Sequence, residues 1–156
     1  MAVGENADAK PISAMDAALE QARIAQTHGE VPIGAVITRH GVIIASAGNR
    51  TRSLNDPTAH AEILAIRYAC EALGSQRIDD CDLYVTLEPC AMCAGAISHA
   101  RIRRLYYGAS DAKGGAVEQG PRFFGQPTCL HAPEIYAGLA ERESTDLLKS
   151  FFKGLR

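Results

Sequence analysis

Residues 82–107 read DLYVTLEPCAMCAGAISHARIRRLYY, and their pattern determines the architecture of the sheet. The first six residues, Asp82–Leu87, predict a strand, and Glu88-Pro89 ends it. The small and apolar residues from Cys90 to about His99 predict a helix, and Ile102–Tyr107 predicts a second strand. A strand, a helix and a strand of this length form a βαβ unit, so we expect these two strands to run parallel.

The remaining elements follow from apolar periodicity, turn residues and helix caps. We expect helices at Pro11–His28 and at roughly Leu139–Lys153, and a third that Asp56 caps, that begins at Pro57 or Thr58 and that Gly74 ends. We expect further strands at Ile33–Thr38, Val42–Ala47 and Pro133–Ala137. The prediction is an α/β fold with a mixed, five-stranded sheet and helices on both faces. Asp111–Thr128, rich in Gly and Pro, predicts a long loop that has a function or little order.

The composition is that of one globular domain over residues 1–156, of which residues 1–10 are expected to be a flexible tail. The first residues lack the features of a signal peptide, and no apolar run is long enough to span a bilayer. The chain has 5 cysteines, an odd number, and two of them share one C-x-x-C. This pattern argues against a secreted disulfide framework and favours a reducing, cytoplasmic compartment.

Two short motifs carry candidate metal ligands. His60 supplies an imidazole, while Cys90 and Cys93, at i and i+3 of the predicted helix, supply two thiolates on one face. Pro89 fits the first turn of that helix, whose N-terminus favours the thiolate form. Three protein ligands leave one tetrahedral position open, as in a catalytic zinc site. Glu62 is a carboxylate that can stay off the metal and move protons.

Other interpretations of these residues stay open. A lone C-x-x-C in a cytosolic protein can be a redox pair. A structural zinc site needs a fourth ligand, for which the chain offers Cys70, Cys81, Cys129 and His131. The placement of His-Ala-Glu after Asp-Pro at a helix start argues against both. A zinc-stabilised RNA-binding module without catalysis is a further alternative, but a structural site has no use for an acid such as Glu62.

The combination of H-x-E with P-C-x-x-C is typical of zinc-dependent base and nucleoside deaminases. Three segments closely resemble bacterial tRNA-specific adenosine deaminases: DPTAHAEI (Asp56–Ile63), YVTLEPCAMCAGA (Tyr84–Ala96) and YGASDAKGGA (Tyr107–Ala116). The likeness runs from about Val31 to Ala116 and more loosely to Phe152. Guanine and dCMP deaminases share the H-A-E and P-C-x-x-C core. A guanine deaminase-like enzyme for small bases or nucleosides is therefore the alternative.

The resemblance implies a three-layer α/β/α cytidine-deaminase-like fold and a cytoplasmic hydrolase that converts adenosine to inosine at the wobble position of the anticodon. It also implies a homodimer with one Zn²⁺ per subunit, and the anticodon stem-loop of tRNA, in particular tRNA-Arg, as substrate. Carried onto this sequence, the zinc ligands are His60, Cys90 and Cys93, and the proton shuttle is Glu62. The implied substrate contacts are Asn49 on the base, Val31, Pro32 and Ile33 in the pocket wall, and Asp111 near a flanking nucleotide.

With a net charge of −2, attraction to RNA must come from local basic clusters. Two candidates are Arg101–Arg104 and Lys149–Arg156, although each is equally typical of a solvated surface. Phe151 and Phe152 are expected to fill the core and not to stack on bases. Glu118–Cys129 (EQGPRFFGQPTC) departs from the family pattern, and its aromatic residues could pack a dimer, touch RNA or anchor the loop.

Overall fold

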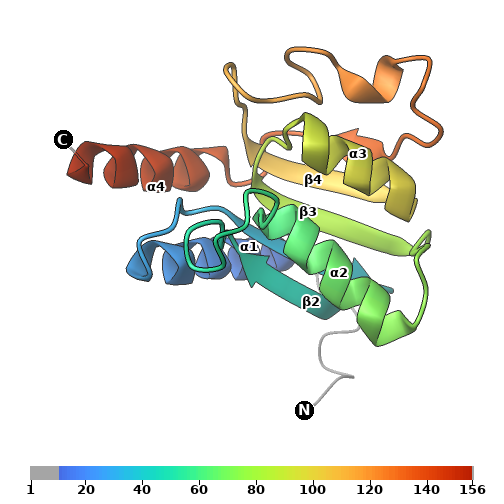
Figure 1. The fold of residues 1–156 in the computed structure, drawn as a ribbon, viewed down its shortest axis with the longest axis horizontal. Helices are drawn as coiled ribbons and strands as arrows, with labels where there is room; N and C mark the ends of the chain where they lie inside the picture. The colour runs from blue at the N-terminus through green and yellow to red at the C-terminus, as the bar shows by residue number, and fades with distance from the viewer. Residues whose placement is uncertain (1–10, 156) are drawn as a thin grey trace.

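The computed structural model describes residues 11–155, without the side chains of Pro11 and Ile12, so the tail expected over residues 1–10 lies outside the described part. The helices are α1 (Pro11–Thr27), α2 (Ala61–Leu73), α3 (Ala91–Ala100) and α4 (Glu141–Gly154), and η2 (Phe123–Gly125) is a short 3-10 helix. The strands are β1 (Gly34–Arg39), β2 (Val42–Gly48), β3 (Cys81–Leu87), β4 (Arg104–Ala109) and β5 (Glu134–Tyr136). Figure 1 shows their arrangement.

The strands form one mixed sheet of 5 strands in the order β2-β1-β3-β4-β5. β1 is antiparallel to both β2 and β3, whereas β3, β4 and β5 are parallel to one another. The parallel β3–α3–β4 unit and the β1–β2 hairpin are therefore confirmed. The hairpin turns at His40 and Gly41, whose φ angles of 51° and 77° suit a tight turn between twisted strands.

Helices cover both faces of the sheet, which confirms the three-layer arrangement (Figure 1). On one face, α1 packs on β1, β2 and β3 and α4 packs on β4. That layer encloses a core that includes Met15, Val36 and Tyr84. On the other face, α2 and α3 cover a larger core that includes Leu64, Leu83 and Ile97. No helix within residues 11–155 is long and apolar enough to cross a membrane.

The start of α2 differs from the prediction. The helix begins at Ala61 and not at Pro57 or Thr58, because Asp56 closes a local turn instead of capping it. One oxygen of the Asp56 carboxylate accepts hydrogen bonds from the Thr58 backbone N–H at 2.8 Å and from the Thr58 hydroxyl at 2.7 Å. His60 is consequently the N-cap residue of α2, with extended dihedrals (φ −71°, ψ 153°), and does not lie in its first turn.

The start of α3 differs in the same way. The helix begins at Ala91, and Cys90 is its extended N-cap residue (φ −76°, ψ 178°). Pro89 precedes the N-cap and is therefore not part of the first turn. Cys93, three residues after the N-cap, does lie in the first turn. Both segments that carry predicted metal ligands thus present them at helix N-termini.

Candidate metal and substrate site

The structure brings His60, Cys90 and Cys93 together. Nδ1 of His60 lies 3.7 Å from Sγ of Cys90 and 3.5 Å from Sγ of Cys93. All three potential ligand atoms lie within 4.8 Å of one another. Metal–ligand bonds of about 2.0–2.3 Å at tetrahedral angles separate the ligand atoms of a zinc site by roughly 3.5 Å. The spacing therefore fits a single zinc ion with one coordination position left over.

The lowered pKa of Cys90 suits a cation at this position. A hydrogen bond from the Cys93 thiol and the contact with His60 lower the pKa of Cys90 to about 4, against the opposing effect of burial. The same hydrogen bond to Cys90, together with burial, raises the pKa of Cys93. The contact with Cys90 also raises the pKa of His60. The two sulfur atoms and the imidazole nitrogen form a soft S/S/N ligand set, which favours zinc over magnesium or calcium.

Glu62 lies in the first turn of α2, two residues after His60, with only 4% of its surface exposed. Among the described residues, the cluster of potential ligands contains His60, Cys90 and Cys93 and does not include Glu62. Burial raises the pKa of the Glu62 carboxyl. A shielded carboxyl group beside a metal site can hold a proton and release it to a reacting atom.

Backbone hydrogen bonds hold Asn49 near the metal cluster. Its N–H donates to the Ile33 carbonyl at 3.0 Å, and the N–H of Arg50 donates to the carbonyl of Ala59, directly before His60, also at 3.0 Å. The Asn49 residue is 6% exposed. It lines a hollow of about 370 Å³ together with Glu30 and residues of α1, and none of the three metal ligands lines this hollow. The predicted base-holding residue therefore lies between the pocket-wall segment and the first metal ligand.

The predicted wall and flanking residues are only partly brought together. Val31 and Asp111 line one open groove of about 820 Å³. Its other lining residues are Leu87, Ser110, Lys113, Gly114, Leu148, Phe152 and Leu155. Pro32 is buried, and Ile33 packs against the larger core. Among the three wall residues, Val31 is thus the one found in the groove with Asp111.

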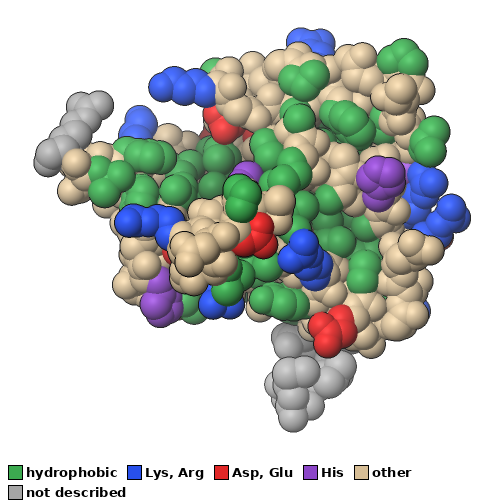
Figure 2. All heavy atoms as spheres, in the orientation of Figure 1, with side chains coloured by type: hydrophobic (Ala, Val, Ile, Leu, Met, Phe, Trp, Pro, Cys, Tyr) green, Lys and Arg blue, Asp and Glu red, His purple; other side chains and the backbone are tan. Residues whose placement is uncertain are grey.

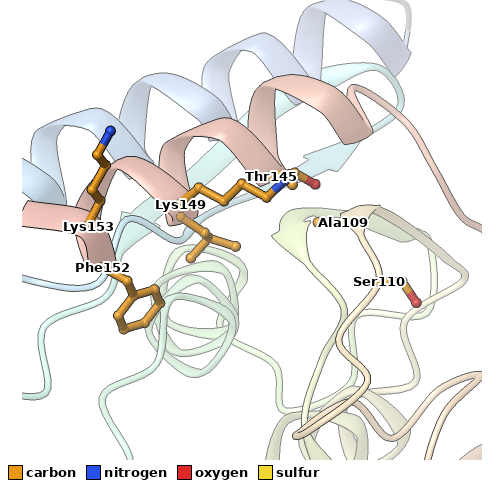
Figure 3. Close-up of a pocket in the computed structure, with 7 residues that line it drawn as sticks. Ala109, Ser110, Thr145, Lys149, Phe152 and Lys153 are labelled. Atoms are coloured by element: carbon orange, nitrogen blue, oxygen red, sulfur yellow. The ribbon is translucent and has the colours of Figure 1, made fainter.

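The groove continues along α4 into a second hollow of about 520 Å³. Figure 3 shows Lys149, Phe152 and Lys153 on α4, with Ala109 and Ser110 across the hollow. Phe152 is 52% exposed, so the expectation that it fills the core is wrong. Phe151 is half-buried and meets the Phe152 ring edge-to-face at 5.3 Å. The exposed ring and the two lysines form a surface that suits a base and its phosphates.

Arg103 and Arg104 of the first basic cluster form ion pairs within the protein. Arg103 binds both carboxylate oxygens of Asp82, at 3.0 and 2.9 Å, and Arg104 contacts Glu134 at 2.9 Å. Arg104 begins β4, whereas the second hollow borders Ala109 at the other end of that strand. The expectation that Arg103 and Arg104 attract RNA therefore has no structural support. Lys149 and Lys153 of the second cluster line the hollow, and Arg156 lies outside the described residues.

The Glu118–Cys129 loop is anchored by its aromatic residues. Phe124 packs against the larger core, and Phe123 meets it edge-to-face at 5.8 Å. The Phe123 N–H donates to the Ala116 carbonyl at 2.7 Å. These contacts support the interpretation that the aromatic residues hold the loop in place.

Two buried carboxylates, Glu30 and Glu88, were not among the residues predicted for the site. They are 1% and 2% exposed and accept hydrogen bonds from the loops that border it. The only signal in the sequence is an acid close to a proline, directly before Val31-Pro32 in one case and before Pro89-Cys90 in the other.

A His/Cys/Cys cluster with an adjacent buried glutamate, at helix N-termini of a three-layer α/β/α fold, defines a zinc-binding deaminase. The chain belongs to the cytidine and deoxycytidylate deaminase family, whose zinc-binding region matches residues 9–109. The tRNA-specific adenosine deaminase of Agrobacterium fabrum is 66% identical over 142 residues, which cover 91% of this chain and 93% of that protein. The resemblance to bacterial tRNA-specific adenosine deaminases is thereby confirmed.

Two solved structures illustrate the range of related proteins. One, from a study of A-to-I editing by tRNA:A34 deaminases at the wobble position, superposes with a TM-score of 0.86 at 67% identity, covering 86% of this chain and 98% of that chain. The guanine deaminase of Bacillus subtilis superposes with a TM-score of 0.61 at 45% identity over 63% of each chain. Proteins with this fold are thus named as deaminases of a tRNA in one case and of a free base in the other.

Proposed function

We propose that the protein is a tRNA adenosine deaminase, which hydrolyses adenosine to inosine at the wobble position of an anticodon and releases ammonia. One observation carries this proposal. The His60, Cys90 and Cys93 cluster has a buried, unligated Glu62 beside it, in a chain 66% identical to a named tRNA-specific adenosine deaminase.

In the proposed mechanism, His60, Cys90 and Cys93 would hold one zinc ion per chain. The ion, when bound, would supply Lewis-acid chemistry that makes water nucleophilic at neutral pH. Glu62 takes a proton from the attacking water and delivers it to a ring nitrogen of the adenine. Glu62 then takes a second proton, from the hydroxyl group added to the ring carbon, and passes it to the amine. The carbonyl of inosine forms as the carbon–nitrogen bond breaks, and the amine leaves as ammonia. The Asn49 carboxamide holds the edge of the base and sets the orientation of the reacting carbon.

The proposed substrate is the anticodon stem-loop of a tRNA, of which tRNA-Arg is the candidate. A duplex hides the reacting carbon within its stack, whereas an anticodon loop presents unpaired bases that can be turned into a pocket. The open groove lined by Val31, Asp111 and Phe152, of about 820 Å³, is our candidate binding surface for nucleotides on either side of the target base. At the left of Figure 2, apolar side chains gather on the C-terminal helix with basic side chains near them. We place this reaction in the cytoplasm.

The proposed homodimer has a candidate surface on the outer side of α2 and α3. Met92 is 37% exposed there, and Ile63 and Ala96 line a shallow apolar hollow. A Cβ added at Gly95 would meet nothing within 4 Å, so α3 presents small residues that permit close approach. Light scattering at micromolar concentration should give a dimer, and Ala96→Glu should shift it to monomer. A monomeric wild-type protein would contradict the proposal.

Inosine formation tests the proposed function directly. We expect efficient turnover of an anticodon stem-loop and little turnover of free adenosine, cytidine or guanine. The second candidate, a guanine deaminase, is favoured by the 45% identity to the Bacillus subtilis enzyme over part of the chain. Rapid deamination of free guanine with no reaction on the stem-loop would replace the first function by the second.

A further inference from the structure

We propose that Glu88 is a positioning residue, which fixes the substrate-facing segment 110–119 relative to the metal cluster and thereby sets the affinity for RNA flanking the target base. This inference rests on the proposed function. Glu88 follows β3 directly and lies two residues before Cys90. It is 2% exposed, so its carboxylate is shielded from water and must be satisfied by protein groups.

The Glu88 carboxylate accepts five hydrogen bonds, all from this segment. Oε1 accepts from the Ser110 hydroxyl at 3.2 Å and from the Asp111 backbone N–H at 3.0 Å. Oε2 accepts from three backbone N–H groups at 2.9–3.1 Å, those of Val117, Glu118 and Gln119. Burial alone would raise the pKa of Glu88, but these backbone donors outweigh it and lower the pKa. One carboxylate therefore joins both ends of the segment.

The backbone around Glu88 reinforces this connection. The Glu88 N–H donates to the Ala109 carbonyl at 2.8 Å, and the Ala116 N–H donates to the Pro89 carbonyl at 2.9 Å. The segment closes so tightly over the carboxylate that a Cβ added at Gly115 would lie 2.6 Å from Cδ of Glu88. Gly115 is therefore required at the point where the segment passes over the carboxylate.

The segment held by Glu88 forms part of the open groove. Asp111 and Lys113 line it, and Oδ1 of Asp111 accepts hydrogen bonds from the N–H groups of Lys113 and Gly114 at 3.1 and 3.0 Å. The Asp111 side chain thus shapes the turn that faces the groove. Because Glu88 is two residues from Cys90, its hydrogen bonds fix where this turn lies relative to the reacting base. Loosening them should weaken binding of flanking nucleotides more than it slows the chemical step.

Glu88→Gln tests this role at nearly constant size. A carboxamide has one oxygen acceptor, and its NH₂ group must face N–H donors, so at least two hydrogen bonds are lost and the charge is removed. We expect KM for an anticodon stem-loop to rise about tenfold or more, while kcat stays within about threefold. Zinc content should be unchanged. Backbone amide exchange should accelerate at Asp111 and at residues 117–119. The matched control is Glu134→Gln, which removes an exposed carboxylate on β5 and should change none of these values.

Gly115→Ala provides a second variant, in which Glu88 keeps its charge but the segment is displaced from it. The same rise in KM with normal zinc content is expected, and this variant carries the test if Glu88→Gln does not fold. Unchanged KM in a folded variant overturns the proposal, as does a fall in kcat that parallels zinc loss. Failure of the wild-type enzyme to deaminate the stem-loop would instead refute the proposed function. The exchange rates then still decide whether Glu88 anchors the segment.

Discussion

Glu30→Gln should destabilise the protein by an amount that the structure allows us to work out. The Glu30 carboxylate is 1% exposed, and its two oxygens accept hydrogen bonds from the N–H groups of Arg52 and Ser53, at 3.1 and 2.7 Å. A carboxamide can accept only one of these bonds and turns its NH₂ group toward the other donor. A lost hydrogen bond to a charged acceptor and a buried unpaired N–H together cost roughly 2–4 kcal/mol of the free energy of unfolding. For a chain of this size that corresponds to a melting temperature lower by roughly 5–10 °C.

The effect of Glu30→Gln should depend on pH in a defined direction. Burial by itself would raise the pKa of Glu30, but the Ser53 and Arg52 backbone donors prevail and lower it. In the unfolded chain, this carboxyl has the reference pKa of glutamate, about 4.3. The pKa in the folded protein lies below that value. The stabilisation is therefore fully present above the unfolded pKa and is lost as the pH falls through the folded pKa.

The assay is urea denaturation of both proteins between pH 7 and about pH 3.5. The difference in unfolding free energy should be constant near neutral pH and should shrink at the acidic end. Glu20→Gln is the control, because Glu20 and Arg23 form an exposed pair at 3.6 Å that contributes little. A difference below about 0.5 kcal/mol at pH 7, or one that does not change with pH, would refute the argument from hydrogen bonds.

Three further predictions concern the site. Cys90→Ser or His60→Ala should lose most of the bound zinc, measured by metal analysis, while Cys70→Ser, near the C-terminal end of α2, should retain it. Full zinc in Cys90→Ser would remove Cys90 from the ligand set. Glu62→Gln should keep zinc and fold but lower kcat by roughly 10²–10⁴, so an active variant would exclude the proton shuttle. The double variant Lys149→Ala, Lys153→Ala should weaken stem-loop binding. It should also reduce the slope of log affinity against log salt concentration by up to about two units. Neutralising Arg103 and Arg104, which are ion-paired, should change this slope little.

The sheet and the metal cluster could be predicted because their signals are local in the sequence. The apolar strands were recognisable from composition, and Gly74 ends α2 as expected, with the left-handed φ of 63° that a glycine readily adopts. The three predicted ligands meet because H-x-E and C-x-x-C each place their residues at a helix N-terminus. Nothing beyond the motifs and the two helix starts was needed to expect that cluster.

The predicted helix and strand boundaries that were wrong depend on interactions that no local sequence pattern indicates. The start of β4 is one example, because α3 ends in a left-handed C-cap residue that is Arg101 and not a glycine. The N–H of the next residue, Ile102, donates to the Ile97 carbonyl at 3.3 Å, and the Ile102 side chain is fully buried. Ile102 was predicted as the first residue of the strand, but it belongs to this cap, so β4 begins only at Arg104.

The groove could not be predicted because it forms between elements far apart in the chain. Leu148 and Phe152 lie on the apolar side of α4, a pattern that by itself favours burial. α4 packs on β4, β3 and α1, and its last turns extend beyond the sheet, so Phe152 stays 52% exposed. Only the packing of α4 against the sheet shows that its final apolar residues face Ser110 and Asp111 across a groove.

Glu30 and Glu88 each anchor a loop, and they do so with the same kind of contact. Each is a buried carboxylate that accepts hydrogen bonds from backbone N–H groups of a loop beside the site. Glu88 also accepts one from the Ser110 hydroxyl. Backbone donors are available whichever side chains the loop carries, so loop side chains can change without loss of the anchor. The loops are held in place before substrate arrives, which reduces the entropy cost of binding a flexible RNA. Under the proposed function, exposed side chains such as Lys113 would determine specificity, while the two carboxylates would determine where those side chains are presented.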